Sequence, residues 1–416
     1  MGHLSSLHLG AVGISAMIFN FIYWNFGFLR MGTTGFIAQA YGANDRNELH
    51  QQLKKALLFA LILSVIIFAL QRVLLSSGIF LLNVPDDQVQ LVTTYFSIRI
   101  YDAPATFLLY VLLGFLFGMQ NALYPLFITL VINMVNILLS YYLVTYMNMD
   151  IKGVAYGTLV AQYLGLLFAA LLVLRKYGDL VFFKTNIEGL NANPSNWIRF
   201  FKVNSDLFIR TTFLTAAFGF FYSQSASQGA IVLASNVILL QFLTWIAYGI
   251  DGFAFASESL VGKYYGAVNW EKMNRVIHLT FKWGAGVALV YTLLIILFGR
   301  DITALFTNDL QIVEHTMSNI VFLILLPLIS FSSYMWDGVF IGLTATREML
   351  QSMILSFLGY LILYYVLAPF STHAIWLAFL IFLLLRGTIQ LIYWTTKIRP
   401  DIRLQFSSVK TAEESD

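Results

Sequence analysis

The sequence predicts an all-α polytopic membrane protein built from two pseudo-symmetric helical bundles. Three observations lead to this fold class: the apolar composition, a series of segments long enough to cross a bilayer, and an internal repeat. Of the 416 residues, 59% are hydrophobic and 11% are charged, whereas a typical soluble domain has about 25% charged residues. A water-soluble core cannot accommodate this much apolar mass, so the chain is predicted to lie in a lipid bilayer.

The composition also argues against several classes of function. The net charge of +3 is small and gives no indication of nucleic-acid binding. The absence of cysteine excludes disulfides, thiol catalysis and thiolate metal sites. The six histidines are scattered and have no metal-ligand spacing. Because neither a phosphate-binding loop nor a catalytic constellation is visible, we predict that the chain is not an enzyme and holds no cofactor.

Eleven apolar segments, each of about 20 residues or more, are predicted to span the membrane. A β-barrel would instead show alternating segments of about ten residues, which this sequence lacks. A polar stretch containing "NANPSN" separates five spans from six. The predicted spans are residues 8–41, 56–81, 90–117, 123–146, 153–174, 199–223, 230–262, 276–299, 313–342, 350–369 and 374–396.

These spans divide the chain into two lobes. Residues 1–178 form the predicted N-terminal lobe, and residues 199–397 form the predicted C-terminal lobe. Residues 179–198 are predicted to be a cytoplasmic linker, and residues 398–416 a cytoplasmic polar tail.

The distribution of lysine and arginine predicts the orientation in the membrane. Most basic residues fall in the loop after the first span, in every second loop from there, and in the tail. The opposite side holds Arg72, Lys152 and Arg300. We therefore predict a multi-pass protein of the plasma (inner) membrane with a cytoplasmic C-terminus.

An internal repeat relates the two lobes at an offset of 224 residues, the separation of Tyr41 and Tyr265. On this offset the span at 199–223 would have its partner before Met1. The repeat therefore predicts that a first helix is missing and that the complete arrangement has six spans in each half. The alternative is a true eleven-span protein with an external N-terminus. The matched positions are Tyr41-Gly42-Ala43 with Tyr265-Gly266-Ala267, Tyr110 with Tyr334, Gly118 with Gly342, and Tyr141 with Tyr365.

Charged residues inside the spans of the C-terminal lobe are the first candidates for function. A charge at the bilayer centre costs about 2.5 kcal/mol or more, so it usually faces a cavity or a partner. Asp206 and Arg210 are four residues apart on one helix and are close enough to pair. Asp251 and Glu258 share a helix face and have no obvious local partner, which favours a role in a functional cavity. Asp337 is a further intramembrane acid, beside a tryptophan.

The N-terminal lobe has its own polar candidates. Asn133, Asn136 and Ser140 share one face of the fourth span, where they could serve a site or simply bond to a neighbouring helix. Arg30, which is flanked by glycines, is interpreted as a structural counter-ion that pairs with an acid inside this lobe. The remaining intramembrane charges are Arg99, Asp102 and Arg386. A repeated bundle with acids in each half and no nucleotide site indicates a secondary active transporter.

Five segments in order resemble the MATE (multidrug and toxic compound extrusion) transporters, specifically the DinF-like branch. The resemblance extends from Met1 to about Lys397 and implies twelve helices in two lobes around a central cavity. The opening "MGHL" resembles the outer end of the family's first helix, so the missing span would be helix 1. The segments are "FGFLRMGTTGFIAQAYGA", "GFLFGMQNALYPL", "NSDLFIRT", "DGFAFASESLVGKYYGA" and "DGVFIGLTATREM".

The resemblance also implies a cation pocket in the N-terminal lobe, formed by an aspartate on helix 1 and an asparagine and an aspartate on helix 5. The asparagine matches Asn136, a possible Na⁺ ligand, but the aspartate's position is Ser140. A hydroxyl offers an oxygen to sodium but does not titrate near neutral pH. We therefore expect coupling to depend on the acids of the C-terminal lobe, namely Asp206, Asp251 and Glu258. Asp337 is a further candidate of lower rank.

The function implied by the resemblance is a cation-coupled antiporter, driven by H⁺ or Na⁺, that exports drugs or other organic compounds by alternating access of the two lobes. The expected partner is a small-molecule substrate, cationic and amphipathic, for a monomer in the lipid bilayer, with no nucleic acid. The alternative is a flippase or exporter of lipid-linked precursors or metabolites from the same superfamily, whose members tend to line the cavity with several arginines. A channel, a membrane enzyme and a non-transporting remnant are further alternatives; neither a filter nor a catalytic constellation is visible.

Overall fold

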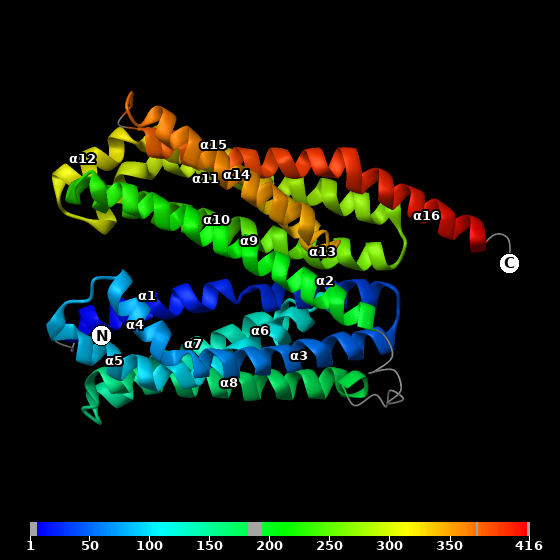
Figure 1. The fold of residues 1–416 in the computed structure, drawn as a ribbon, viewed down its shortest axis with the longest axis horizontal. Coiled ribbons are helices and arrows are strands. Elements are labelled where there is room, and N and C mark those ends of the chain that lie inside the picture. The colour runs from blue at the N-terminus through cyan, green and yellow to red at the C-terminus, as the bar shows by residue number, and fades with distance from the viewer. Residues whose placement is uncertain (1–5, 182–193, 372, 414–416) are drawn as a thin grey trace. The chain divides into compact units, whose positions relative to one another are not determined.

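The computed structural model describes residues 6–181, 194–371 and 373–413, and every regular element within them is helical (Figure 1). The all-α membrane fold is therefore confirmed. Ten of the described segments are long and apolar enough to cross a membrane. The predicted span 199–223 lies in α9 (Pro194–Ser227) and is not among the ten; the first half of this helix carries Arg199, Lys202, Asp206 and Arg210.

The chain divides into two compact units. Unit 1 comprises residues 1–41 and 45–198, and unit 2 comprises residues 42–44 and 199–416. Most of the predicted linker, residues 182–193, lies outside the described residues. The helices of the first unit are α1 (Ser6–Asn25), α2 (Phe28–Gly42), α3 (Arg46–Ala69), α4 (Gln71–Leu81), α5 (Asp86–Arg99), α6 (Ala103–Gly118), α7 (Leu123–Thr145) and α8 (Asp150–Val181). After α9, the second unit continues with α10 (Ala230–Gly266), α11 (Trp270–Phe306), α12 (Leu310–Ser318), α13 (Ile320–Gly342), α14 (Thr346–Leu367), α15 (Ala374–Tyr393) and α16 (Arg399–Glu413).

The internal repeat reappears in the positions where helices begin and end. The starts of α1 and α10, α3 and α11, α5 and α12, and α8 and α15 are all separated by the same 224 residues that separate Tyr41 and Tyr265, and so are the ends of α6 and α13. The two bundles are therefore built on one helical plan, as the sequence predicts.

The turns between helices repeat as well. Asn44 (φ 55°), which follows α2 and belongs to unit 2, corresponds to Val268 (φ 51°), which follows α10. Both residues adopt the left-handed backbone conformation after the end of a helix. The next residue in each case is the N-cap of the following helix: Asp45 accepts a hydrogen bond from the Glu48 amide, and Asn269 from the Lys272 amide. A β-branched residue such as Val268 rarely adopts a positive φ. The turn geometry is thus imposed by the packed helices on either side.

Close helix crossings at glycine are a third repeated feature. In unit 1, a Cβ atom on Gly114 of α6 would lie 2.5 Å from the carbonyl oxygen of Arg30 on α2. In unit 2, a Cβ atom on Gly338 of α13 would lie 2.3 Å from the carbonyl oxygen of Ala254 on α10. Both glycines begin a Gly-x-x-x-Gly pattern, which lets two helical backbones approach closely inside a membrane. Each bundle therefore contains a glycine-dependent crossing at the same position of the repeat.

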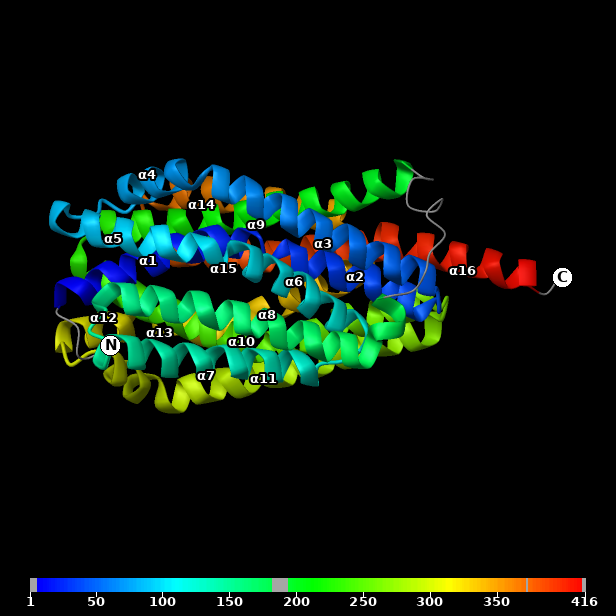
Figure 2. The ribbon, with the colours of Figure 1, turned by 90° about the horizontal axis from the view of Figure 1, so that it is seen from below.

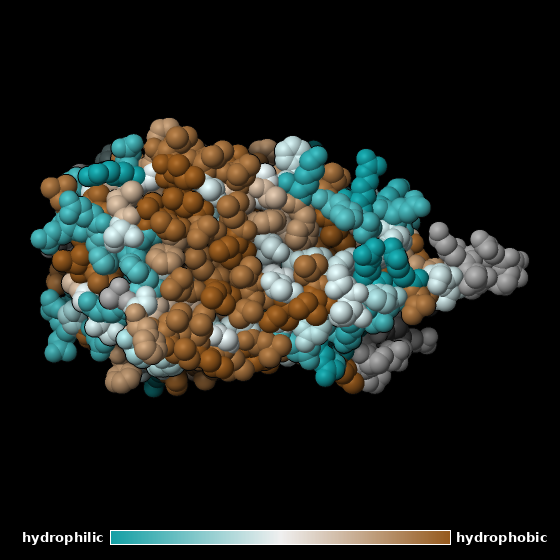
Figure 3. All heavy atoms as spheres, turned by 90° about the horizontal axis from the view of Figure 1, so that it is seen from above, coloured by the Kyte–Doolittle hydropathy of each residue, from teal (hydrophilic) through white to brown (hydrophobic). Residues whose placement is uncertain are grey.

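The outward faces of the helices are apolar. In unit 1, α7 packs beside α8 (Figure 2) and exposes Ile137 and Leu138 by 66% and 63%. On the face drawn in Figure 3, apolar side chains form a broad central band and hydrophilic side chains gather toward the helix ends. Such a surface is suited to a lipid bilayer, because the hydrocarbon core offers no hydrogen-bond partners to polar side chains.

Candidate functional site

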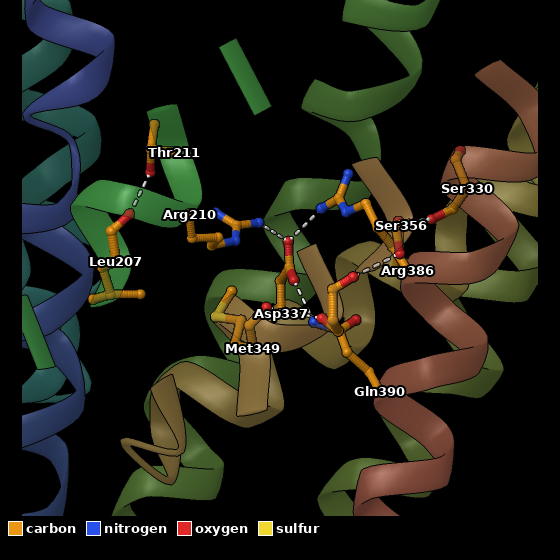
Figure 4. A network of polar contacts seen from close by, with 11 residues as sticks. Leu207, Arg210, Thr211, Ser330, Asp337, Met349, Ser356, Arg386 and Gln390 are labelled. Atoms are coloured by element: carbon orange, nitrogen blue, oxygen red, sulfur yellow. Dashed lines mark hydrogen bonds and ion pairs between the residues drawn. The ribbon is translucent and has the colours of Figure 1, made fainter. Parts of the chain in front are cut away.

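A cluster of buried charges in unit 2 centres on Asp337 of α13 (Figure 4). Its Oδ2 atom accepts hydrogen bonds from Arg210 of α9 and from Nη2 of Arg386 of α15, the latter at 2.8 Å. Its Oδ1 atom accepts a hydrogen bond from Nε2 of Gln390, also at 2.8 Å. Arg386 and Gln390 are four residues apart, so one face of α15 supplies both contacts. Three helices are thereby joined through one carboxylate.

The charges of this cluster do not balance. Two guanidinium groups surround one carboxylate, which leaves a net charge of +1 on side chains that are almost completely buried: Arg210 is 4% exposed and Arg386 is 2% exposed. The Nε atoms of both arginines are buried without a hydrogen-bond partner among the residues that the structure describes. Both oxygens of Asp337 already accept from donors. The cluster is therefore poorly arranged to bind a metal cation.

The pairing of Asp206 with Arg210, suggested by their spacing, is wrong. Arg210 pairs with Asp337 instead, and Oδ2 of Asp206 accepts a hydrogen bond from Oγ1 of Thr346 at 3.0 Å. The two side chains diverge because Arg210 faces α13, whereas Asp206, one turn earlier, meets the first residue of α14.

The other two candidate acids of this lobe lie on α10. Glu258 is buried, with 1% of its surface exposed, and Asp251 is half-buried two turns before it. The main chain at Glu258 lies against α13, where a Cβ atom on Gly342 would approach the Glu258 carbonyl oxygen to 2.5 Å. Glu258 is therefore held at the close crossing of the two helices.

Of the three polar residues predicted on the fourth span, Asn136 and Ser140 lie against α8. Asn136 of α7 donates from Nδ2 to Oγ1 of Thr158 on α8 at 2.9 Å, and Asn133 is exposed. The Ser140 hydroxyl is buried against Gly157 of α8 and has no hydrogen-bond partner among the described residues. These contacts match the interpretation that Asn136 bonds to a neighbouring helix. No group of three or more His, Cys, Asp or Glu side chains in the described part of the chain could hold a metal ion.

Unit 1 has a buried carboxylate of its own, Asp102, which is completely inaccessible to solvent. The Tyr23 hydroxyl of α1 donates to its Oδ1 atom, and Nε of Arg99 donates to its Oδ2 atom at 3.3 Å. The Arg99 guanidinium also lies 4.7 Å from the centre of the Phe19 ring. The sequence marks Arg99 and Asp102 only as intramembrane charges. Their three-residue spacing could have predicted the pair, whereas nothing in the sequence indicates Tyr23.

Arg30, the expected structural counter-ion, lies on α2. Its guanidinium is 5.8 Å from the centre of the Phe117 ring on α6, and its main-chain oxygen accepts a hydrogen bond from Thr34 at 2.9 Å. The residue therefore contributes to the crossing of α2 and α6. Its pairing with an acid stays a prediction.

Comparisons with known proteins agree with this architecture. The chain matches the MatE family over residues 1–142 and 208–370. It is 33% identical to DNA damage-inducible protein F of Escherichia coli (strain K12) over 398 residues, which are 95% of this chain and 86% of that protein. It is 21% identical to the probable multidrug resistance protein NorM of Bacillus cereus over 402 residues, which are 94% of this chain and 88% of that one.

Solved structures share the fold. A crystal structure of a MATE protein in a bent conformation aligns with a TM-score of 0.85 at 21% identity, covering 98% of this chain and 89% of the other. A transporter of the MOP superfamily from Pyrococcus furiosus, described as having a binding pocket of reverse polarity, aligns with a TM-score of 0.82 at 21% identity, covering 98% and 90%.

Proposed function

Because the chain belongs to the MATE family of multidrug and toxin extrusion transporters, we propose that it is an antiporter that exports cationic organic compounds in exchange for protons. One observation carries the choice of proton over sodium. The carboxylates of Asp102 and Asp337 are surrounded by hydrogen-bond donors and guanidinium groups. Hard metal cations require a shell of oxygen ligands, and an arginine has no acceptor atom to offer.

The acids of α10 are the proposed coupling groups of the C-terminal lobe. Asp337 is already neutralised by two arginines, and Asp206 accepts from Thr346. Glu258 is a buried acid at the crossing of α10 and α13, and a carboxylate at membrane depth needs a compensating positive charge or a proton. Competition between a proton and a cationic substrate for this carboxylate would couple outward movement of the substrate to inward movement of the proton. Asp251, two turns away on the same helix, is the second candidate.

Transport in everted membrane vesicles tests this proposal. With the cationic dye ethidium as substrate, we expect uptake when a proton gradient is imposed and none when a sodium gradient is imposed. Glu258→Gln should reduce proton-driven uptake about tenfold or more, a typical size for a lost coupling energy. Glu271→Gln, which removes an exposed carboxylate at the start of α11, should transport normally. Uptake driven by sodium, or an unaffected Glu258→Gln variant, would contradict the proposal.

A second candidate function is export of anionic compounds, including lipid-linked precursors. It is favoured by the excess of arginine over acid in the Asp337 cluster and by the Nε atoms of Arg210 and Arg386, which have no hydrogen-bond partner in the described part of the chain. The same vesicles, supplied with the anionic dye carboxyfluorescein, distinguish the two functions. Uptake of this dye in place of ethidium would favour the second.

A further inference from the structure

We propose that Asp102, together with Tyr23 and Arg99, forms a second proton-carrying site, located in unit 1. The inference rests on the proposed function, since a proton carrier has a role only if transport is coupled to protons. It assigns to the N-terminal lobe a titrating group in place of the carboxylate that its fourth span lacks at Ser140.

The first support is the position of Asp102 in its helix. The span Asp86–Gly118 changes its winding at its midpoint, where α5 ends and a short 3₁₀ turn, η1 (Ile100–Asp102), leads into α6. Pro104, which lacks an amide hydrogen, is the second residue of α6. A 3₁₀ turn within an otherwise continuous helix often marks a functional hinge.

The second support is that the neighbours of Asp102 tolerate both of its protonation states. The Tyr23 hydroxyl donates to the ionised carboxylate, and it can accept a hydrogen bond from the protonated one, because a phenol is both donor and acceptor. If the carboxylate is neutral, Arg99 keeps its contact with the Phe19 ring at 4.7 Å and its hydrogen bond to the Tyr95 hydroxyl at 3.4 Å. Protonation therefore leaves neither partner buried without a contact.

Asp337 differs from Asp102 in the charge that protonation would leave behind. Protonating Asp337 would leave two buried guanidinium groups, with a combined charge of +2, around a neutral acid. Protonating Asp102 leaves one guanidinium group, that of Arg99, whose side chain retains 14% exposure. The carboxylate of unit 1 can therefore exchange a proton at a much smaller electrostatic cost.

The remaining groups around Asp102 do not compete for the proton. Its ionisable neighbours on the packed elements are Tyr23 of α1, Arg99 of α5, Tyr110 of α6 and Tyr163 of α8, and Arg30 of α2 faces Tyr110. Tyrosines and arginines keep one charge state throughout the physiological pH range. Among these groups Asp102 alone can bind and release a proton at a pH below the range in which tyrosine and arginine titrate.

The experiment uses the purified full chain in liposomes with ethidium as the probe, and it measures two activities. The first is accumulation driven by an imposed proton gradient. The second is exchange of labelled for unlabelled ethidium at equal pH on both sides, which requires no net proton movement. For Asp102→Asn we expect accumulation to fall about tenfold or more, while exchange stays within about twofold of the original protein. Asp102→Glu should restore accumulation, and Asp87→Asn, an exposed acid in the first turn of α5, should change neither activity.

A third variant separates a titrating site from a structural ion pair. Tyr23→Phe removes a donor to the ionised carboxylate, and such a bond contributes about one pH unit to its proton affinity. Because the ionised form loses a hydrogen bond, the pH midpoint of accumulation should move upward. A purely structural role would change the yield of folded protein and leave this midpoint in place.

The outcomes distinguish the two proposals. If the original protein accumulates ethidium under a proton gradient and Asp102→Asn does so equally well, the assignment of Asp102 is wrong and the proposed function stands. If Asp102→Asn loses exchange together with accumulation while Asp102→Glu restores neither, the assignment is also overturned. If the original protein shows no proton-driven accumulation, both proposals fail.

Discussion

Replacing Gly338 by valine is expected to destabilise unit 2 by about 3 kcal/mol or more, a loss at the upper end for an overpacked core. Even a Cβ atom at this position would lie 2.3 Å from the Ala254 carbonyl oxygen, and that oxygen belongs to the backbone of α10, which cannot rotate away as a side chain could. The helices would have to separate. We expect the melting temperature of the protein in detergent to fall by roughly 10 °C, together with the yield of monodisperse protein in size-exclusion chromatography.

A glycine on the partner helix provides the matched control. A Cβ atom on Gly252 of α10 would meet nothing within 4 Å. Gly252→Ala should therefore fold normally and gain about 0.5–1 kcal/mol from the better helix propensity of alanine. A melting temperature for Gly338→Val equal to that of Gly252→Ala would show that the close crossing of α10 and α13 does not limit stability.

The fold could be predicted from the sequence because it depends on local signals that recur along the chain. Local signals decide the helical plan: apolar length sets the spans, and residues such as Gly42, Gly118 and Gly342 mark where helices end. Because these signals recur at a fixed offset, the repeat can be recognised without knowledge of any tertiary contact. The shared capping by Asp45 and Asn269 arises from the same local chemistry.

The polar clusters could not be predicted in the same way, because their partners are distant in sequence and the repeat does not duplicate them. The counterpart of Asp337 at the repeat offset is Leu113, and that of Asp102 is Leu326. Arg210 has an acid four residues before it, yet it pairs with one 127 residues away. Charge pairing inside a membrane depends on which helix faces meet, and that information lies in the packed bundle. A close sequence neighbour is therefore a weak guide to a buried ion pair.

The two units share a helical plan but not their buried charges, and this has a consequence for the mechanism. Two lobes with the same helical plan but different buried carboxylates can bind protons with different affinities. Unit 1 holds Asp102 with one arginine, whereas unit 2 holds Asp337 with two. We interpret the first arrangement as a proton-exchange site and the second as a structural charge cluster.

Asp337→Asn should consequently act on stability, and we expect a loss of about 3–5 kcal/mol, the range for breaking a buried ion pair from one side. The variant removes the carboxylate that Arg210 and Arg386, which are 4% and 2% exposed, both pair with. In thermal unfolding, the melting temperature should fall substantially, and it should fall in the absence of any substrate or proton gradient.

A compensating variant tests whether the excess positive charge causes the loss of stability in Asp337→Asn. Asp337→Asn combined with Arg386→Gln returns the cluster to its original net charge of +1, because one arginine is removed together with the acid. The double variant should be more stable than Asp337→Asn alone, with a coupling energy within the usual range of about 0.5–3 kcal/mol for residues in contact. If the two losses simply add, the arginines are stabilised by something other than Asp337, and the carboxylate would then be available to exchange a proton like that of Asp102.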